Sequence, residues 1–122
     1  MGKVLIVDNA SFMRSSLKYI VEKAGHEVVG IAVNGNEALK LYKELKPDVV
    51  TLDILMEGMD GLTALNNLKK DDPDAKVIMV TALGQTEKED EAKKLGASGY
   101  IRKPFKVEDI VAEIGRVMGK GS

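Results

Sequence analysis

The 122-residue sequence contains no cysteine, which excludes disulfide bonds, thiol catalysis and thiolate metal sites. Tryptophan is also absent, and aromatic residues make up only 4% of the chain, too few for a surface that stacks nucleic-acid bases. Lys and Arg number 18 against 19 Asp and Glu, so the net charge of −1 offers no basic surface for nucleic acid or an anionic membrane. No apolar run is long enough to span a bilayer. We therefore expect a soluble, cytoplasmic protein with no nucleic-acid or membrane partner.

The residues that are present are typical of one folded domain. Hydrophobic residues make up 44% of the chain and charged residues 30%, and there are only 3 prolines. A chain of this length buries enough apolar surface to form a core without disulfide or metal crosslinks. We expect a single domain over residues 1–118 and a disordered tail over residues 119–122, where Gly-Lys-Gly-Ser follows the last apolar periodicity.

The apolar pattern alternates between short continuous runs and helical spacing, which predicts strands and helices in alternation. We expect strands over residues 4–7, 28–32, 49–53, 77–81 and 100–101. We expect helices over residues 12–24, 38–45, 62–68, 86–95 and 107–118. Strands that are apolar throughout are typical of a parallel sheet covered on both faces by helices, so the fold class is α/β. The common order for five such strands is 2-1-3-4-5, and we expect that order here.

Polar residues stand at the ends of four of the five predicted strands: Asp8 with Asn9, then Asp53, Thr81 and Lys103. Taken singly, each has an ordinary explanation as a helix cap, a turn residue, a strand former or a surface charge. The carboxyl ends of parallel strands meet at one edge of the sheet, so we expect these side chains to converge. An Asp is a competent nucleophile towards phosphorus, Mg²⁺ prefers carboxylate ligands, and Lys and Thr can bind phosphate oxygens. This grouping favours phosphoryl transfer to Asp53.

These residues belong to a set of motifs that resembles the response-regulator receiver domain in its stand-alone, chemotaxis-type (CheY-like) form. The resemblance implies a flavodoxin-like (CheY-like) three-layer α/β/α fold with a five-stranded parallel sheet of order 2-1-3-4-5 and five helices. The motifs cover essentially the whole chain and are VLIVD at 4–8, FMR at 12–14, NGNEA at 34–38, LKPDVVTLD at 45–53, MDG at 59–61, VTA at 80–82, GA at 96–97 and YIRKPF at 100–105.

The resemblance implies a role for each residue at the phosphorylation site. Asp53 would be the phosphoacceptor, charged by a histidine kinase, and Lys103 would contact the phosphoryl group beside a cis bond to Pro104. Mg²⁺ would be held by Asp8, by Asp53 and by the main-chain carbonyl of Leu55. Such a protein catalyses phosphoryl transfer to and from its own Asp and is not a turnover enzyme.

The resemblance also implies how the signal would leave the domain. Thr81 would move onto the aspartyl phosphate, and Tyr100 would swing inward behind it, which shifts the population between two conformers. The output surface would lie within about residues 84–118. The implied partners are a histidine kinase, a phosphatase and a downstream protein such as a flagellar motor switch, and the implied process is chemotaxis.

Two positions depart from the family pattern. Asn9 stands where the family usually has a second acid that binds the metal directly, so we expect Asn9 to be a weak or substituted ligand and Mg²⁺ binding to be weaker. Glu57 stands where the family loop normally has proline, and we interpret it as a solvated charge, with partial compensation for Asn9 as the sharper hypothesis. The main alternative function is therefore a receiver-like interaction module whose phosphorylation is weakened or lost.

Two other classes of protein fit less well. A flavodoxin-like flavin binder would need a Ser/Thr/Gly-rich phosphate loop after the first strand, where this chain has Asp8. A haloacid-dehalogenase-type phosphatase would need a second Asp two residues after the first, where this chain has Leu55.

Three further features have structural interpretations. His26 follows Gly25 and is interpreted as a turn residue, and the charged stretch over residues 87–91 as a solvated helix face. The 6 methionines fall mostly at core spacings. Gly30 interrupts a predicted strand for no reason visible in the sequence.

Overall fold

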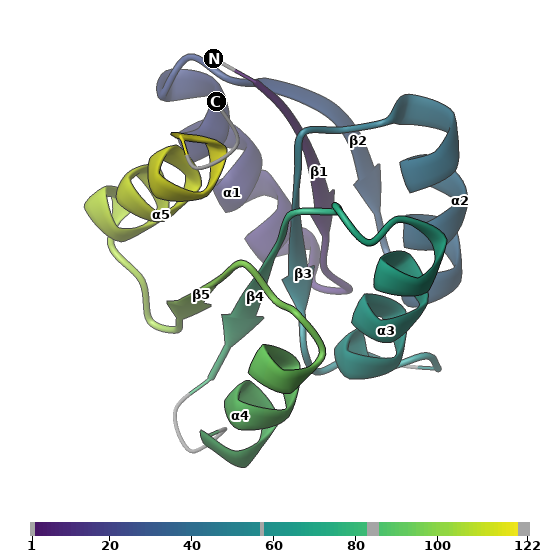
Figure 1. Cartoon of the computed structure of the whole chain (residues 1–122). Helices are drawn as coiled ribbons and strands as arrows, with labels where there is room; N and C mark the ends of the chain where they lie inside the picture. Colours follow the sequence, from purple (N-terminus) through teal and green to yellow (C-terminus); the bar gives the residue numbers. More distant parts are fainter. Residues whose placement is uncertain (1, 57, 83–85, 120–122) are drawn as a thin grey trace.

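A computed structural model describes residues 2–56, 58–82 and 86–119, in which five strands alternate with five helices (Figure 1). The elements in chain order are β1 (Lys3–Val7), α1 (Ser11–Lys23), β2 (Glu27–Ala32), α2 (Gly35–Leu45), β3 (Val49–Asp53), α3 (Gly61–Asp71), β4 (Val77–Thr81), α4 (Thr86–Lys94), β5 (Gly99–Arg102) and α5 (Val107–Gly119). Gly119, the first residue of the expected tail, ends α5, and residues 120–122 lie outside the described residues. No helix within the described ranges has the length and apolar character needed to cross a membrane.

The five strands form one parallel sheet of order β2-β1-β3-β4-β5, which confirms the predicted α/β class and strand order. Helices α1 and α5 pack on one face of the sheet, and α2, α3 and α4 pack on the other (Figure 1). Each face has its own apolar core, because neighbouring residues of a strand point to opposite faces. Leu5 and Leu52 pack with Leu65 on one face, whereas Ile6 and Ile78 pack on the other.

The N-terminal ends of two helices are fixed by side-chain caps. The Asn34 side chain accepts a hydrogen bond of 2.8 Å from the main-chain N–H of Glu37, so α2 begins directly at Gly35, earlier than the helix expected over residues 38–45. Asp60 caps α3 in the same way through the N–H of Thr63, at 2.8 Å. The caps satisfy backbone donors that the helices themselves leave unpaired, and they fix where α2 and α3 start.

The structure explains Gly30 by close packing. A Cβ atom at this position would lie 2.6 Å from the Leu45 side chain and 3.3 Å from the Leu5 side chain. The pairing of β1 with β2 is irregular between Val4 and Leu5, so that Leu5 pairs with Gly30. Glycine therefore allows α2 to approach the bulged strand β2 closely.

Candidate functional site

Asp53 is the last residue of β3, and its side chain lies at the carboxyl edge of the sheet, where it is 6% exposed. Its Oδ1 accepts a hydrogen bond from the N–H of Leu55 at 3.2 Å. The loop returns tightly to this point, because the Gly61 N–H donates to the carbonyl of Ile54 at 2.8 Å. A Cβ on Gly61 would collide with the carbonyl oxygen of Asp53, so glycine is required for α3 to begin this close to the strand.

Asp8 directly follows β1, which lies next to the central strand β3, and it is fully buried. Its Oδ1 accepts a hydrogen bond from the N–H of Ala10 at 2.8 Å, whereas its Oδ2 accepts none from the described residues. The Arg14 guanidinium donates to the main-chain carbonyl of Asp8 at 2.8 Å and not to the carboxylate. One buried carboxylate oxygen is therefore left without a hydrogen bond, which is unfavourable unless a cation approaches it.

Lys103, which follows β5, brings one positive charge to both carboxylates. Its Nζ lies 3.4 Å from Asp53 Oδ2 and 3.8 Å from Asp8 Oδ2, and the side chain is 23% exposed. The peptide bond to Pro104 is cis, as the resemblance implied. Burial and the neighbouring Asp8 raise the pKa of Asp53, and Lys103 counteracts this in part. Two carboxylates thus share one ammonium group and keep an excess negative charge.

This donor set fits a small hard cation. Among the described residues, no group of three or more acidic or histidine side chains is placed to hold a metal ion, so protein carboxylates alone would not complete a coordination shell. Mg²⁺ does not need one, since it binds through one or two carboxylates and keeps several waters. Asp8 Oδ2, which accepts no hydrogen bond from the described residues, and the excess negative charge suit such an ion. Beside them is a hollow of about 370 Å³ whose lining residues are Asn9, Leu55, Met56, Asp60 and Lys88.

Thr81 ends β4 at the same edge, but its hydroxyl is not bonded to either carboxylate. Thr81 Oγ1 donates to Glu89 Oε2 at 2.9 Å, and Glu89 is also paired with Arg102. The interpretation of residues 87–91 as a solvated helix face is therefore wrong for Glu89, which is buried. Helical spacing carried the missing signal, because Glu89 lies three residues before the fully buried Ala92.

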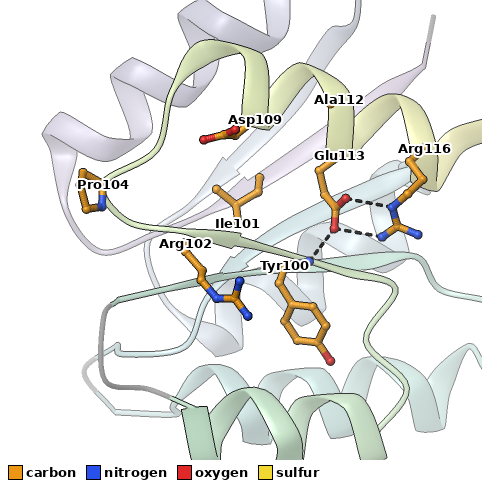
Figure 2. Close-up of a pocket in the computed structure, with 8 residues that line it drawn as sticks. All are labelled: Tyr100, Ile101, Arg102, Pro104, Asp109, Ala112, Glu113 and Arg116. Atoms are coloured by element: carbon orange, nitrogen blue, oxygen red, sulfur yellow. Dashed lines mark hydrogen bonds and ion pairs between the residues drawn. The ribbon is translucent and has the colours of Figure 1, made fainter.

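Tyr100 on β5 places its ring against the core and its hydroxyl oxygen in a buried position without a hydrogen-bond partner among the described residues. Burial raises the pKa of this hydroxyl, and the nearby charges of Glu89 and Asp90 add to the effect. Figure 2 shows the Tyr100 main chain facing α5, where its N–H donates to Glu113 at 2.8 Å. The ring points to the other side of the strand, towards α4 (Figure 2).

The structure thus brings together Asp8, Asp53 and Lys103 and places Thr81 at the same edge with its hydroxyl bonded elsewhere. Asn9 and Leu55 are exposed at the rim. Glu57, interpreted as a solvated charge with partial compensation for Asn9 as the sharper hypothesis, lies outside the described residues.

Comparison with known families gives a match over residues 4–115 to the model for the response regulator receiver domain. The chain is 52% identical over 118 residues to the chemotaxis protein CheY of Thermotoga maritima, covering 96% of this chain and 98% of that protein. It is 51% identical over 111 residues to CheY of Listeria monocytogenes, covering 91% and 93%.

Solved structures give the same result. A response regulator receiver domain protein from Clostridium thermocellum superposes with a TM-score of 0.93 at 30% identity, covering 99% of this chain and 97% of that one. The chemotaxis protein CheY4 of Vibrio cholerae gives a TM-score of 0.88 at 31% identity, covering 96% and 98%.

Proposed function

The chain belongs to the response regulator receiver domain family, and from this premise we propose that it is a phosphorylation-activated switch of a two-component system acting in chemotaxis. The observation that carries the proposal is the position of Asp53, buried at the strand end with Lys103 3.4 Å away and Asp8 beside the same lysine. In this family the domain is a signalling switch and not a turnover enzyme.

The reaction that we propose is phosphoryl transfer from the phosphohistidine of a histidine kinase. An Asp53 carboxylate oxygen forms a bond to phosphorus as the P–N bond breaks, and the histidine nitrogen keeps the bonding electron pair and takes up a proton from solvent. The Lys103 ammonium binds a phosphoryl oxygen as a point charge, which stabilises the charge that develops during transfer. Burial of Asp53 keeps competing water from most of its surface.

We infer that Mg²⁺ is the cofactor and that Asp8, Asp53 and the main-chain carbonyl of Leu55 hold it. When bound, the ion neutralises charge on the carboxylates and on the incoming phosphoryl group. Asn9 offers an amide oxygen but no charge, so it is a weak ligand at most. The buried Asp8 Oδ2 supports this assignment, because it accepts no hydrogen bond from the described residues and its ion pair with Lys103 is long, at 3.8 Å.

We further propose that the signal leaves through protein contact, on the face formed by α4, β5 and α5. A hollow of about 480 Å³ lies there, between β5 and α5 (Figure 2). Tyr100 joins this face to the site, since its ring lies on the α4 side of β5, and we propose that it turns further inward when Thr81 moves. The partners would be a histidine kinase, a flagellar motor switch protein and a phosphatase, all met in the cytoplasm.

The test is the intact mass of the protein after incubation with acetyl phosphate or phosphoramidate, with and without Mg²⁺. We expect the folded wild type to gain one phosphoryl group only when Mg²⁺ is present, and Asp53→Ala to gain none. Asp74→Ala is the matched control, because Asp74 is an exposed Asp in the turn before β4, and it should be phosphorylated like the wild type.

Asn9 favours a second candidate, a receiver-shaped binding module that is no longer phosphorylated. If the folded wild type gains no mass and its spectrum does not respond to beryllofluoride, this second candidate replaces the first.

A further inference from the structure

A buried carboxylate, that of Glu89, holds the hydroxyl of Thr81 and is itself paired with Arg102. Glu89 on α4 accepts a hydrogen bond at Oε2 from the Thr81 hydroxyl, with an oxygen–oxygen distance of 2.9 Å. Arg102 on β5 donates to Glu89 Oε1 from Nη2 at 2.8 Å and from Nε to both carboxylate oxygens at 3.2 Å. The Glu89 side chain is 11% exposed, whereas that of Arg102 is 69% exposed. The carboxylate is therefore inside the protein, and the cation that neutralises it covers it from the surface.

The sheet register places these groups together. Thr81 pairs with Arg102 across β4 and β5, so their side chains leave the sheet side by side on the same face. Glu89 reaches both of them from the first turns of α4, which packs on that face. A single carboxylate thus links the last residue of β4, the last residue of β5 and α4.

Glu89 and the phosphoryl group of the proposed reaction compete for the same hydroxyl of Thr81. A threonine hydroxyl carries one proton and can donate it to one acceptor at a time. Glu89 is held ionised, since the hydrogen bonds from Arg102 lower its pKa. An ionised carboxylate is a strong acceptor, so Thr81 must leave it before it can donate to a phosphoryl oxygen on Asp53.

Arg102 makes the release reversible. When Thr81 leaves, Glu89 Oε2 still accepts a hydrogen bond from Arg102 Nε, so no buried carboxylate oxygen is left unpaired. The buried carboxylate of Glu89 therefore keeps its hydrogen bonds from Arg102 whether or not Thr81 is bound to it, so both states of the switch are accessible.

We propose that Glu89, supported by Arg102, is a positioning residue that holds Thr81 on α4 in the unphosphorylated protein and competes with the phosphoryl group for its hydroxyl. This inference rests on the proposed function. It adds a residue outside the phosphoryl site that sets the equilibrium between the two positions of the Thr81 hydroxyl. An ion pair that only fastened α4 to β5 would not depend on the Thr81 hydroxyl, and this difference makes the proposal testable.

The test is the affinity for beryllofluoride, a phosphoryl mimic, followed by amide NMR at saturating Mg²⁺. Glu89→Met keeps an unbranched side chain and removes the acceptor, so we expect binding about tenfold tighter than wild type, equivalent to about 1.4 kcal/mol. Glu91→Met is the matched control, because Glu91 is exposed on the same helix, and it should bind within about twofold of wild type. In a Thr81→Val background, Glu89→Met should give no gain.

The outcomes separate the two proposals. A folded wild type that does not respond to beryllofluoride overturns the proposed function and this inference with it. If the wild type responds, two results overturn the inference alone. One is that Glu89→Met binds beryllofluoride no more tightly than wild type, and the other is that Glu89→Met still increases the affinity in the Thr81→Val background.

A crystal structure of the wild type with Mg²⁺ and beryllofluoride gives an independent result should Glu89→Met fail to fold. We expect Thr81 Oγ1 to contact the fluoride and Arg102 to remain on Glu89. A Thr81 hydroxyl still bonded to Glu89 in that complex contradicts the proposal.

Discussion

Replacing Lys103 with methionine tests the electrostatic description of the site. At an effective dielectric constant of about 20, the contacts at 3.4 Å to Asp53 and 3.8 Å to Asp8 correspond to about 5 and about 4 kcal/mol of gross attraction. Desolvation of the lysine end cancels much of this. We expect Lys103→Met to lower the free energy of unfolding by about 2–3 kcal/mol near neutral pH, because it leaves two buried carboxylates without a cation.

The loss should depend on pH in a defined direction. Asp53 already has a raised pKa in the folded protein, and removal of Lys103 raises it further. A raised carboxylate pKa means that the folded state binds the proton more tightly than the unfolded chain, so stability falls as pH rises. The difference between Lys103→Met and wild type should therefore be small below about pH 4 and grow towards neutrality.

Urea unfolding followed by circular dichroism in chelator-containing buffer measures this difference. Lys106→Met, which removes an exposed lysine three residues further on, should match wild type at every pH. Adding Mg²⁺ should restore part of the stability of Lys103→Met, because it supplies a cation to the same carboxylates. A loss that is equal at all pH values, or no loss near neutrality, refutes the electrostatic reasoning.

Three further substitutions give distinct results. Asn9→Asp should bind Mg²⁺ about tenfold more tightly in a calorimetric titration, since an added charge at an exposed position keeps only part of its gross attraction; unchanged affinity would place Asn9 away from the ion. Gly61→Ala should lower the free energy of unfolding by more than about 2 kcal/mol, because its Cβ would collide with the backbone of Asp53, and a loss under about 0.5 kcal/mol would contradict the close packing. His26 accepts a hydrogen bond at Nδ1 from the Gly2 N–H, and burial lowers the pKa of its imidazole. The contribution of His26 to the free energy of unfolding should therefore be complete above about pH 6.5 and fall below it. His26→Ala should lack this pH dependence in denaturant titrations, and a pH profile identical to that of wild type would contradict the role of His26.

Much of the fold was predictable because its signals are local. A continuous apolar run such as residues 4–7 is best explained by a strand covered on both faces, and these residues lie in β1. The predicted start of α2 was too late because Asn-Gly is common in turns. Glu37, three residues after Asn34, completes a capping-box pattern that marks the earlier start. The strand order could not be worked out from the residues, and it was taken from the common order of five-stranded sheets of this class.

The convergence of Asp8, Asp53 and Lys103 was also predictable, since parallel strands place their carboxyl ends at one edge. The partner of Thr81 was not. Glu89 and Arg102 are 13 residues apart and lie on different elements, so their contact depends on how α4 packs on β5. Within the charged stretch at 87–91, helical spacing from Ala92 selects Lys88 and Glu89 as the inward candidates, and the structure shows that Glu89 is the buried one.

The close approach of Gly61 to Asp53 makes the site mechanically asymmetric. On that side, the start of α3 abuts the backbone of Asp53, the proposed phosphoacceptor, and five of the residues of α3 are buried: Gly61, Leu62, Ala64, Leu65 and Leu68. On the Thr81 side, α4 is anchored only by Glu89 and Ala92 among its residues Thr86–Lys94. A helix with so little buried surface yields at lower free energy than one fixed in the core. On the proposed function, we therefore expect a phosphoryl group on Asp53 to displace α4 and to leave α3 in place.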